Sequence, residues 1–119
     1  MYTLDTNAII YHLQGENILL EVMKDDEAFF ISSITELELL SFADLSVRDR
    51  KAINGLLKTC NIVRVDSQIA RMAAFIRSKN KIKTPESIIA ATAIFTDTVL
   101  LTRNIKDFKN IALLQIQKI

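Results

Sequence analysis

The sequence predicts an α/β fold in which helices cover both faces of a parallel sheet of four to five strands. Short, uniformly apolar runs alternate with longer amphipathic segments along all 119 residues. Strands that are apolar throughout, with no polar face, are typical of parallel sheets buried on both sides. The alternation of strand and helix favours the same architecture. No linker, repeat or low-complexity segment interrupts the pattern, so we expect a single domain over residues 1–119.

The first half of the chain opens on a short β-like run and continues with helix and strand candidates. The periodicity predicts, in order, a strand at 2–4, helices at 7–14 and 17–24, a strand at 28–32 and a helix at 36–43. The helical segments carry apolar residues three and four apart, whereas 28–32 is a compact apolar run. Ser46 then offers a side-chain oxygen suited to cap a helix that reaches Cys60.

The second half of the chain repeats this alternation. Thr84 followed by Pro85 predicts a helix start, with the threonine as cap and the proline at the first helical position. The helix over 86–96 is apolar almost all round, so we expect neighbours on more than one side of it. The other predicted elements are strands at 62–65, 99–102 and 112–116, and a helix from the capping residue Asp66 to about Asn80.

Scarce residue types exclude several kinds of site. The two glycines stand far apart, at 15 and 55, so the chain contains no glycine-rich phosphate loop and no dinucleotide motif. One cysteine excludes an internal disulfide and a cysteine-based zinc site, and one histidine excludes chemistry that needs two. The fourteen carboxylates are therefore the groups we expect to carry any reaction, on a chain of net charge +1.

The N-terminus lacks the features of a secretory signal. No basic segment precedes an apolar stretch there. The longest apolar stretch, residues 88–95, is far shorter than the ~20 residues that cross a bilayer. We therefore expect a cytoplasmic protein.

Four acids follow predicted strands or begin a helix near them. Asp5 ends the first strand, Glu38 and Asp107 follow the strands at 28–32 and 99–102, and Glu86 lies in the first turn of the apolar helix. Because ligands of open α/β sheets bind beyond the carboxyl ends of the strands, these four acids are candidates to meet at one edge. Clustered carboxylates repel one another unless a cation or a proton relieves them, and Mg²⁺ or Mn²⁺ suits oxygen ligands.

Each acid also has a structural explanation. Thr35 and Glu38 have the spacing of a capping box, Glu86 suits the dipole of a helix start, and Asp107 suits a solvated loop. Asp5 follows an apolar strand directly, so we expect it to be partly buried. Glu36 competes with Glu38, because residues two apart on a helix point about 200° apart and cannot both face one site.

Two other phosphate chemistries are disfavoured. Aspartyl phosphotransferases use Asp-x-Asp after their first strand, and here the third position is Asn7. A receiver domain needs a pair of acids near that strand, which is missing as well.

Four blocks of sequence stand out along the chain. They are Leu4-Asp5-Thr6-Asn7, Ile31-Ser32-Ser33-Ile34-Thr35-x-x-Glu38-Leu39, Pro85-Glu86-Ser87-Ile88-Ile89-Ala90-Ala91-Thr92-Ala93 and Leu101-Thr102-Arg103-Asn104-x-x-Asp107-Phe108. Together, and over essentially the whole chain, they resemble the PIN-domain family, in particular the VapC-type ribonuclease toxins of toxin–antitoxin systems.

The resemblance implies a three-layer α/β/α sandwich and a Mg²⁺- or Mn²⁺-dependent endoribonuclease that hydrolyses RNA phosphodiester bonds. The implied catalytic and metal-binding acids are Asp5, Glu38, Glu86 and Asp107. The implied supporting residues are Thr6, Thr102 and Asn104. The family's third acid is ordinarily Asp, and the extra methylene of Glu86 moves the carboxylate by ~1.5 Å. An alternative is therefore a catalytically weakened domain that binds RNA or a partner.

Basic residues near these acids are candidates to contact RNA phosphates without reading sequence: Arg77, Lys79, Lys81, Lys83, Arg103 and Lys106. For residues 77–83, the other interpretation is a solvated loop whose cations favour the end of the preceding helix. The resemblance further implies a homodimer and a cognate small antitoxin protein. Leu39, Phe42, Leu45 and the segment 17–24 are candidates for that contact, and core burial is their other explanation.

Overall fold

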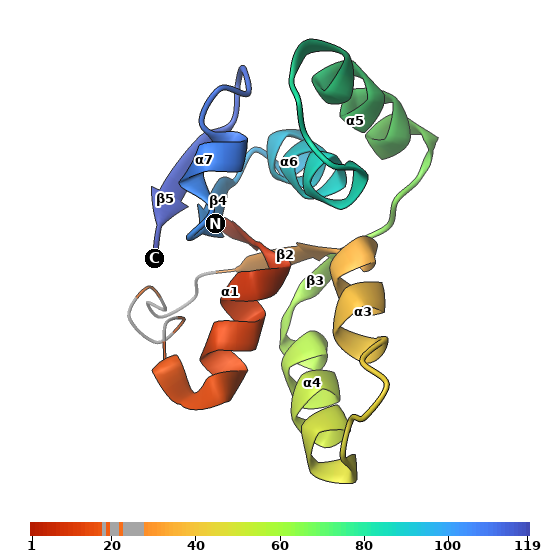
Figure 1. The fold of residues 1–119 in the computed structure, drawn as a ribbon, viewed down its shortest axis with the longest axis vertical. Helices are drawn as coiled ribbons and strands as arrows, with labels where there is room; N and C mark the ends of the chain where they lie inside the picture. Colours follow the sequence, from red (N-terminus) through yellow and green to blue (C-terminus); the bar gives the residue numbers. More distant parts are fainter. Residues whose placement is uncertain (18, 20–21, 23–27) are drawn as a thin grey trace.

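The protein is built on one sheet of five parallel strands, in the order β3-β2-β1-β4-β5. This computed structural model describes residues 1–17, 19, 22 and 28–119. The strands are β1 (Tyr2–Leu4), β2 (Phe29–Ser32), β3 (Asn61–Val63), β4 (Val99–Thr102) and β5 (Gln115–Lys118). β1 lies at the centre, so its carboxyl end opens in the middle of the sheet edge (Figure 1).

Helices connect the strands and cover the sheet. They are α1 (Thr6–Tyr11), the π-helical turn η1 (His12–Glu16), α3 (Ser33–Leu40), α4 (Val47–Thr59), α5 (Ser67–Lys79), α6 (Thr84–Thr96) and α7 (Ile105–Phe108). Gly15, at φ 94°, breaks the helical path inside η1, and Asn17 follows in the left-handed region. Glycine adopts this φ without steric cost, so the chain can change direction at this position.

Two apolar cores lie on opposite faces of the sheet. Leu100 packs into a core with α5, α6 and α7, whereas its neighbour Leu101 packs into a second core with α1, α3 and α4. Successive strand residues point to opposite faces, so this division confirms the predicted layers of helix, sheet and helix. Helix α6 is buried on several sides, as its apolar sequence predicted. In the described part of the chain, none of the helices has the length and apolarity that crossing a membrane requires.

Several predicted boundaries were wrong by a few residues. The predicted helix at 36–43 begins earlier, at Ser33, and the last strand begins at Gln115 rather than 112. Most of the predicted helix at 17–24 lies outside the described residues. The remaining strands agree with the prediction to within two residues.

Two predicted helix caps were also wrong. Helix α6 starts at Thr84 itself, with Lys83 in the cap position and no side-chain cap bond. Ser32, not Thr35, caps α3 by accepting a hydrogen bond from the Ile34 amide at 3.1 Å. Thr35 is fully buried inside the helix, so the capping-box explanation for Glu38 fails.

Candidate functional site

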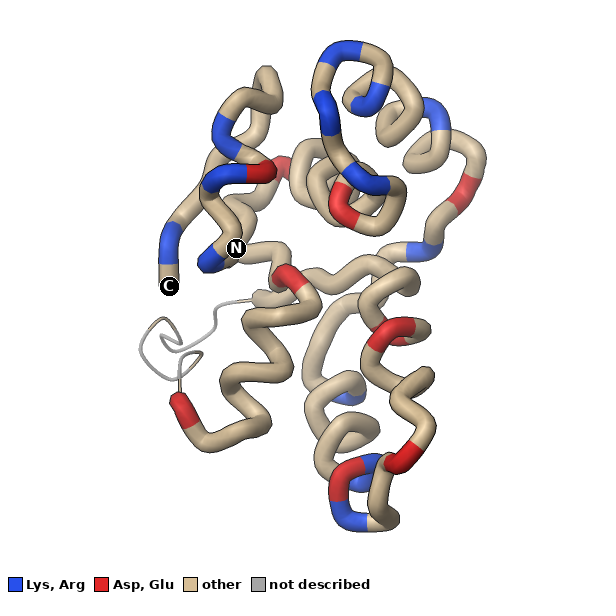
Figure 2. Tube along the Cα trace, viewed as in Figure 1, with Lys and Arg blue, Asp and Glu red and all other residues tan. Residues whose placement is uncertain are grey.

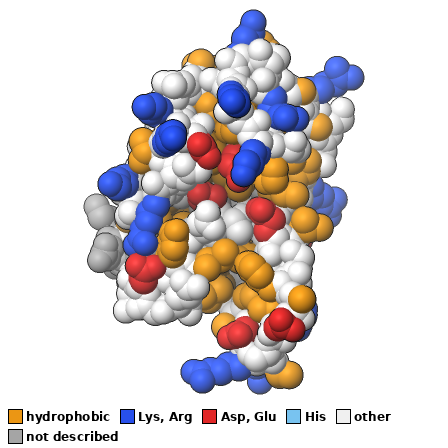
Figure 3. All heavy atoms as spheres, viewed as in Figure 1, with side chains coloured by type: hydrophobic (Ala, Val, Ile, Leu, Met, Phe, Trp, Pro, Cys, Tyr) orange, Lys and Arg blue, Asp and Glu red, His pale blue; other side chains and the backbone are white. Residues whose placement is uncertain are grey.

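Three of the four predicted acids line one pocket at the carboxyl end of the sheet. Asp5 follows β1, Glu38 projects from α3 and Glu86 from the first turn of α6. We call this the acidic pocket, and its other lining residues are Thr6, Asn7, Ile10, Ser41, Phe42 and Ile89. Figure 3 shows acidic side chains gathered in the hollow at the centre of this face. Glu36 does not line the pocket, so the helix resolves the competition with Glu38 as the family pattern implied.

Asp5 is the most buried of these acids, with 5 % of its surface exposed. Its Oδ2 accepts a hydrogen bond from the Thr102 hydroxyl at 2.7 Å, and that hydroxyl oxygen accepts the Asn104 amide at 2.9 Å. Burial raises the pKa of Asp5, and the charges of Glu86 and Glu38 raise it further, against the lowering effect of the Thr102 and Thr6 hydrogen bonds. The site therefore holds a carboxylate that is costly to ionise without a cation.

A pair of threonines orients Glu38. The Thr6 hydroxyl donates to Glu38 Oε1 at 2.8 Å and lies 3.0 Å from the hydroxyl of Thr35. Both threonines are buried, and they join the start of α1 to the start of α3. The predicted supporting residues Thr6 and Thr102 thus each hold one acid of the pocket.

Glu86 provides the observation that points most directly to a positively charged ligand in this pocket. Its Oε2 is buried and has no hydrogen-bond partner. A buried carboxylate oxygen is ordinarily paired or bound to a metal ion. Its pocket offers two further carboxylates, and oxygen donors are what Mg²⁺ and Mn²⁺ prefer.

The residues present therefore fit a hard divalent cation. Within the described ranges, no three acidic, histidine or cysteine side chains form a ready-made metal cage. Mg²⁺ keeps several of its waters and is bound through one or two carboxylates, so an open set of acids suits it.

Asp107 does not join the other three acids. It lies exposed in the short helix α7, where its Oδ2 accepts the Asn104 side-chain amide at 2.8 Å. It lines a separate hollow, which we call the basic pocket, with Arg77, Lys81, Ile82, Lys83 and Lys106. Figure 2 shows Lys and Arg positions in the loop before α6 and in α7. Of the four acids that we predicted to meet at the sheet edge, three therefore share one pocket.

Two of the six predicted basic residues lie elsewhere. The Lys79 ammonium sits over the ring of Phe75, 5.9 Å from its centroid, and lines a different groove. Arg103 forms an ion pair with Glu16 at 3.1 Å. The other four, Arg77, Lys81, Lys83 and Lys106, line the basic pocket together, so the structure joins residues from two separate basic stretches.

Three polar residues around the acids were not among the predicted site residues. Asn7 and Ser41 line the acidic pocket, and Tyr11 lines a neighbouring one with Arg103. Asn7 stands in the first motif block, so its spacing was a usable signal. Tyr11 and Ser41 had no such signal, because their places depend on how α1 and α3 approach the sheet edge.

An apolar groove adjoins the acidic pocket between α1, α3 and α4. It shares Ile10 and Phe42 with that pocket, and Phe42 is 52 % exposed. Leu45 also lines it, while Leu39 is only 1 % exposed and belongs mainly to the core, so its other explanation, core burial, holds. Of the predicted segment 17–24, the described residue Leu19 is buried and most others lie outside the described residues.

Comparison with known proteins identifies the family of this chain. The family model described as the PIN domain matches residues 2–114, a span that includes all four predicted acids. The chain belongs to the PIN domain family.

This PIN domain has relatives over nearly its full length. It is 31 % identical over 117 residues to Ribonuclease VapC19 of Mycobacterium tuberculosis, covering 91 % of this chain and 92 % of the relative. A toxin–antitoxin complex from Klebsiella pneumoniae is similar in structure, with a TM-score of 0.82, 31 % identity and coverage of 96 % and 95 % of the two chains. DNA-bound VapBC from Salmonella typhimurium gives a TM-score of 0.86 with 25 % identity, over 98 % and 96 %.

Proposed function

We propose that this PIN domain, as a single unit over residues 1–119, is a metal-dependent endoribonuclease and the toxin of a type II toxin–antitoxin pair. The relative named Ribonuclease VapC19 and the toxin–antitoxin structures support this. The observation that carries the metal-dependent part is the acidic pocket, in which Glu86 Oε2 is buried without a partner beside Asp5 and Glu38.

Asp5, Glu38 and Glu86 would hold Mg²⁺ or Mn²⁺ in this pocket. Such an ion, when bound, supplies Lewis-acid activation of the phosphodiester and of the attacking water. Thr102 fixes one oxygen of Asp5, and Thr6 fixes one oxygen of Glu38, so each acid keeps its other oxygen for the ion or its waters. A carboxylate of the pocket accepts the proton of the attacking water.

Asp107 lies in the basic pocket and would influence the acidic pocket indirectly, through Asn104. The Asn104 side chain bonds to Asp107, while its backbone amide bonds to the Thr102 hydroxyl that holds Asp5. The chain of bonds thus connects Asp107 to the acidic pocket without placing it among the three acids.

RNA must reach an acidic centre, so its phosphates need cations nearby. The basic pocket presents Arg77, Lys81, Lys83 and Lys106 around a single carboxylate. These side chains would hold phosphates beside the scissile bond and would contribute affinity rather than sequence selection.

A small antitoxin is the proposed protein partner. The apolar groove opens directly beside the acidic pocket, because Ile10 and Phe42 line both. A partner segment seated in the groove would therefore extend over the acids and block RNA. We also propose that the toxin is a homodimer, as the family resemblance implies.

The test of the nuclease is cleavage of a labelled RNA with Mg²⁺ or Mn²⁺, by the parent and by Asp5→Asn. The matched control is Asp44→Asn, which changes an exposed aspartate between α3 and α4. We expect metal-dependent cleavage that Asp5→Asn abolishes and Asp44→Asn leaves intact. Equal cleavage by the parent and Asp5→Asn would refute the carboxylate mechanism.

A second candidate function is a PIN domain that binds RNA or a partner with little catalysis. The longer acid Glu86 favours it, because a displacement of ~1 Å at a catalytic group can cost ~100-fold in rate. An inactive parent that gains cleavage on Glu86→Asp would support this function. An active parent that Glu86→Asp slows would refute it.

A further inference from the structure

A second small pocket opens beside Asp5, away from the other two acids. Its lining residues are Asp5, Asn7, Tyr11, Arg103 and Asn104, and we call it the Arg103 pocket. Asp5 and Asn7 line both this pocket and the acidic one, so a ligand spanning the two would pass directly over Asp5. A nucleotide next to a phosphate held at the acids would reach this place.

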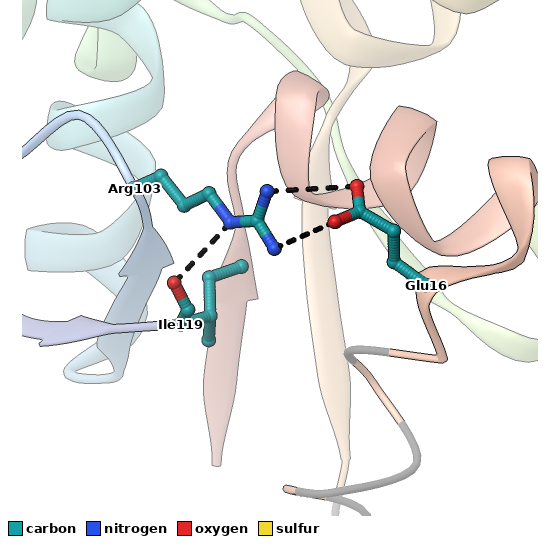
Figure 4. A network of polar contacts seen from close by, with 3 residues as sticks. All are labelled: Glu16, Arg103 and Ile119. Carbon is teal, nitrogen blue, oxygen red and sulfur yellow. Dashed lines mark hydrogen bonds and ion pairs between the residues drawn. The ribbon is translucent and has the colours of Figure 1, made fainter.

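Arg103 is fixed in this pocket by three separate partners, two of which, Glu16 and Ile119, are shown in Figure 4. Its two terminal nitrogens donate to the two carboxylate oxygens of Glu16, at 3.5 and 3.1 Å, and its Nε donates to the Ile119 carbonyl at 3.3 Å. The guanidinium also lies over the ring of Tyr11, 4.3 Å from the centroid. An arginine with this many anchors is a rigid plane rather than a mobile charge.

The anchors leave Arg103 able to bind a ligand. A guanidinium has five N–H donors, and the three bonds use one donor on each nitrogen, which leaves two free. The side chain is also 38 % exposed. Asn7, which lines the same pocket, is exposed and adds a neutral amide with both a donor and an acceptor.

Charge separates this pocket from the basic pocket. Four cations surround Asp107 in the basic pocket, which therefore suits phosphate. In the Arg103 pocket the single cation is paired with Glu16 and lies near Asp5, so little positive charge remains for a phosphate. Neutral amides, an aromatic ring and a guanidinium plane suit a nucleobase, because unpaired RNA bases stack on such planes and bond through their edges.

We propose that the Arg103 pocket is a nucleobase subsite, which holds the base of a nucleotide adjoining the scissile phosphate; this rests on RNA being the substrate. Arg103 stacks on the base from the side opposite Tyr11, and Asn7 bonds to the base edge. Glu16 is a positioning residue that acts only through Arg103. The RNA would thus make phosphate contacts in the basic pocket and a base contact in the Arg103 pocket.

Binding measured without cleavage tests the subsite directly. The probes are fluorescein-labelled oligo(A), oligo(C) and oligo(U) of about eight nucleotides, a length suited to a single-strand site. Fluorescence anisotropy is read in EDTA over a series of salt concentrations. We expect the parent to discriminate among the three oligonucleotides.

Arg103→Ala should weaken binding of the preferred oligonucleotide by about 5- to 150-fold, the range for loss of one stacked base. Arg103→Ala should also make the affinities for oligo(A), oligo(C) and oligo(U) nearly equal. Arg103→Lys should behave like Arg103→Ala, since the charge alone does not stack. Lys83→Ala, the matched control in the basic pocket, should weaken all three equally and reduce the salt slope by about 0.7.

Glu16→Gln tests the positioning role of Glu16, because it keeps the shape of the side chain and weakens the paired hydrogen bonds from Arg103. We expect it to lower base discrimination without changing the salt slope. Tyr11→Leu removes the ring but keeps apolar bulk, so it tests the stack even if the Arg103 variants do not fold. Thermal melting of each variant shows whether it is folded.

Clear outcomes would overturn the subsite. If folded Arg103→Lys keeps the parent's base preference, or if Arg103→Ala lowers the salt slope as Lys83→Ala does, Arg103 contacts phosphate instead. If folded Arg103 and Tyr11 variants bind as the parent does, or the parent shows no base preference, the pocket is only structural. Loss of cleavage in Asp5→Asn with unchanged binding in these variants would leave the nuclease standing and the subsite refuted. Base-selective binding without cleavage would refute only the nuclease.

Discussion

Replacing Asp5 by asparagine should stabilise the metal-free protein at neutral pH. Asp5 is buried, and its carboxylate shares a pocket with Glu38 and Glu86. Burial, together with these two charges, raises the pKa of Asp5 in the folded protein above its value in the unfolded chain. Below the pKa of the unfolded chain, Asp5 is protonated in both states and costs no stability. As the pH rises through the higher pKa of the folded protein, Asp5 must ionise in its buried site and the protein loses stability. The ionised Asp5 therefore destabilises the fold at neutral pH.

The size of the effect follows from what asparagine removes and what it keeps. A buried polar group that is incompletely compensated costs about 1–3 kcal/mol, and a charged one costs more. The amide oxygen can still accept the Thr102 hydroxyl, but this 2.7 Å bond loses about 1 kcal/mol when its acceptor becomes neutral. The neutral amide also removes the repulsion from Glu86 and Glu38. We expect a net gain of about 1–2 kcal/mol, or roughly 4–8 °C in melting temperature.

Thermal unfolding followed by circular dichroism in EDTA, from about pH 8 to about pH 4, measures this gain. The gain should be largest at the neutral end and should shrink toward acid pH as Asp5 takes up its proton in the parent. Asp44→Asn, in an exposed loop, should change little at either end. A loss of stability at neutral pH, or a gain that does not depend on pH, would show that burial and repulsion do not govern Asp5.

Three further predictions concern the same pocket. Mg²⁺ at 100-fold above its dissociation constant should stabilise the parent by about 2.7 kcal/mol in thermal melts, and Asp5→Asn should lose most of this response. Glu86→Gln, which keeps the shape and removes the charge, should lower cleavage by about 100-fold with an unchanged melting profile in EDTA or a higher one, and full activity would exclude Glu86 from the mechanism. Thr102→Val removes the bond to Asp5 and should cost about 1.5–3 kcal/mol in denaturant unfolding, whereas Thr102→Ser should be nearer the parent. Equal losses of stability in Thr102→Val and Thr102→Ser would show that side-chain packing, rather than the hydrogen bond to Asp5, accounts for the effect.

The sequence predicted the layers well because they depend on short-range patterns. Apolar runs such as 99–102 have no polar face, and only a sheet covered on both sides accommodates them. Leu100 and Leu101 indeed pack into opposite cores. Ser46 and Asp66 cap α4 and α5 as predicted, whereas Thr84 and Thr35 do not cap, since a side-chain oxygen caps a helix only if the backbone turns there. Thr35 is instead needed inside the protein beside Thr6.

The position of Asp5, Glu38 and Glu86 could be anticipated for a similar reason. Parallel strands all end at the same edge, so Asp5 and Glu38, which closely follow β1 and β2, come together there. Glu86 joins them because α6 begins at this edge before it leads into β4. The sequence alone therefore determined the fold class, the edge at which the site lies and the acidic character of its chemistry.

Only the tertiary structure decided which neighbours these residues meet. Asp107 lies among cations because α7 turns it toward the loop before α6, and the bond to Asn104 keeps it there. Arg103 meets Glu16 across 87 residues of sequence, through a reversal at Gly15 that no local periodicity reports. Contacts between distant segments depend on how helices are oriented on the sheet, and side-chain packing over the whole core sets that orientation.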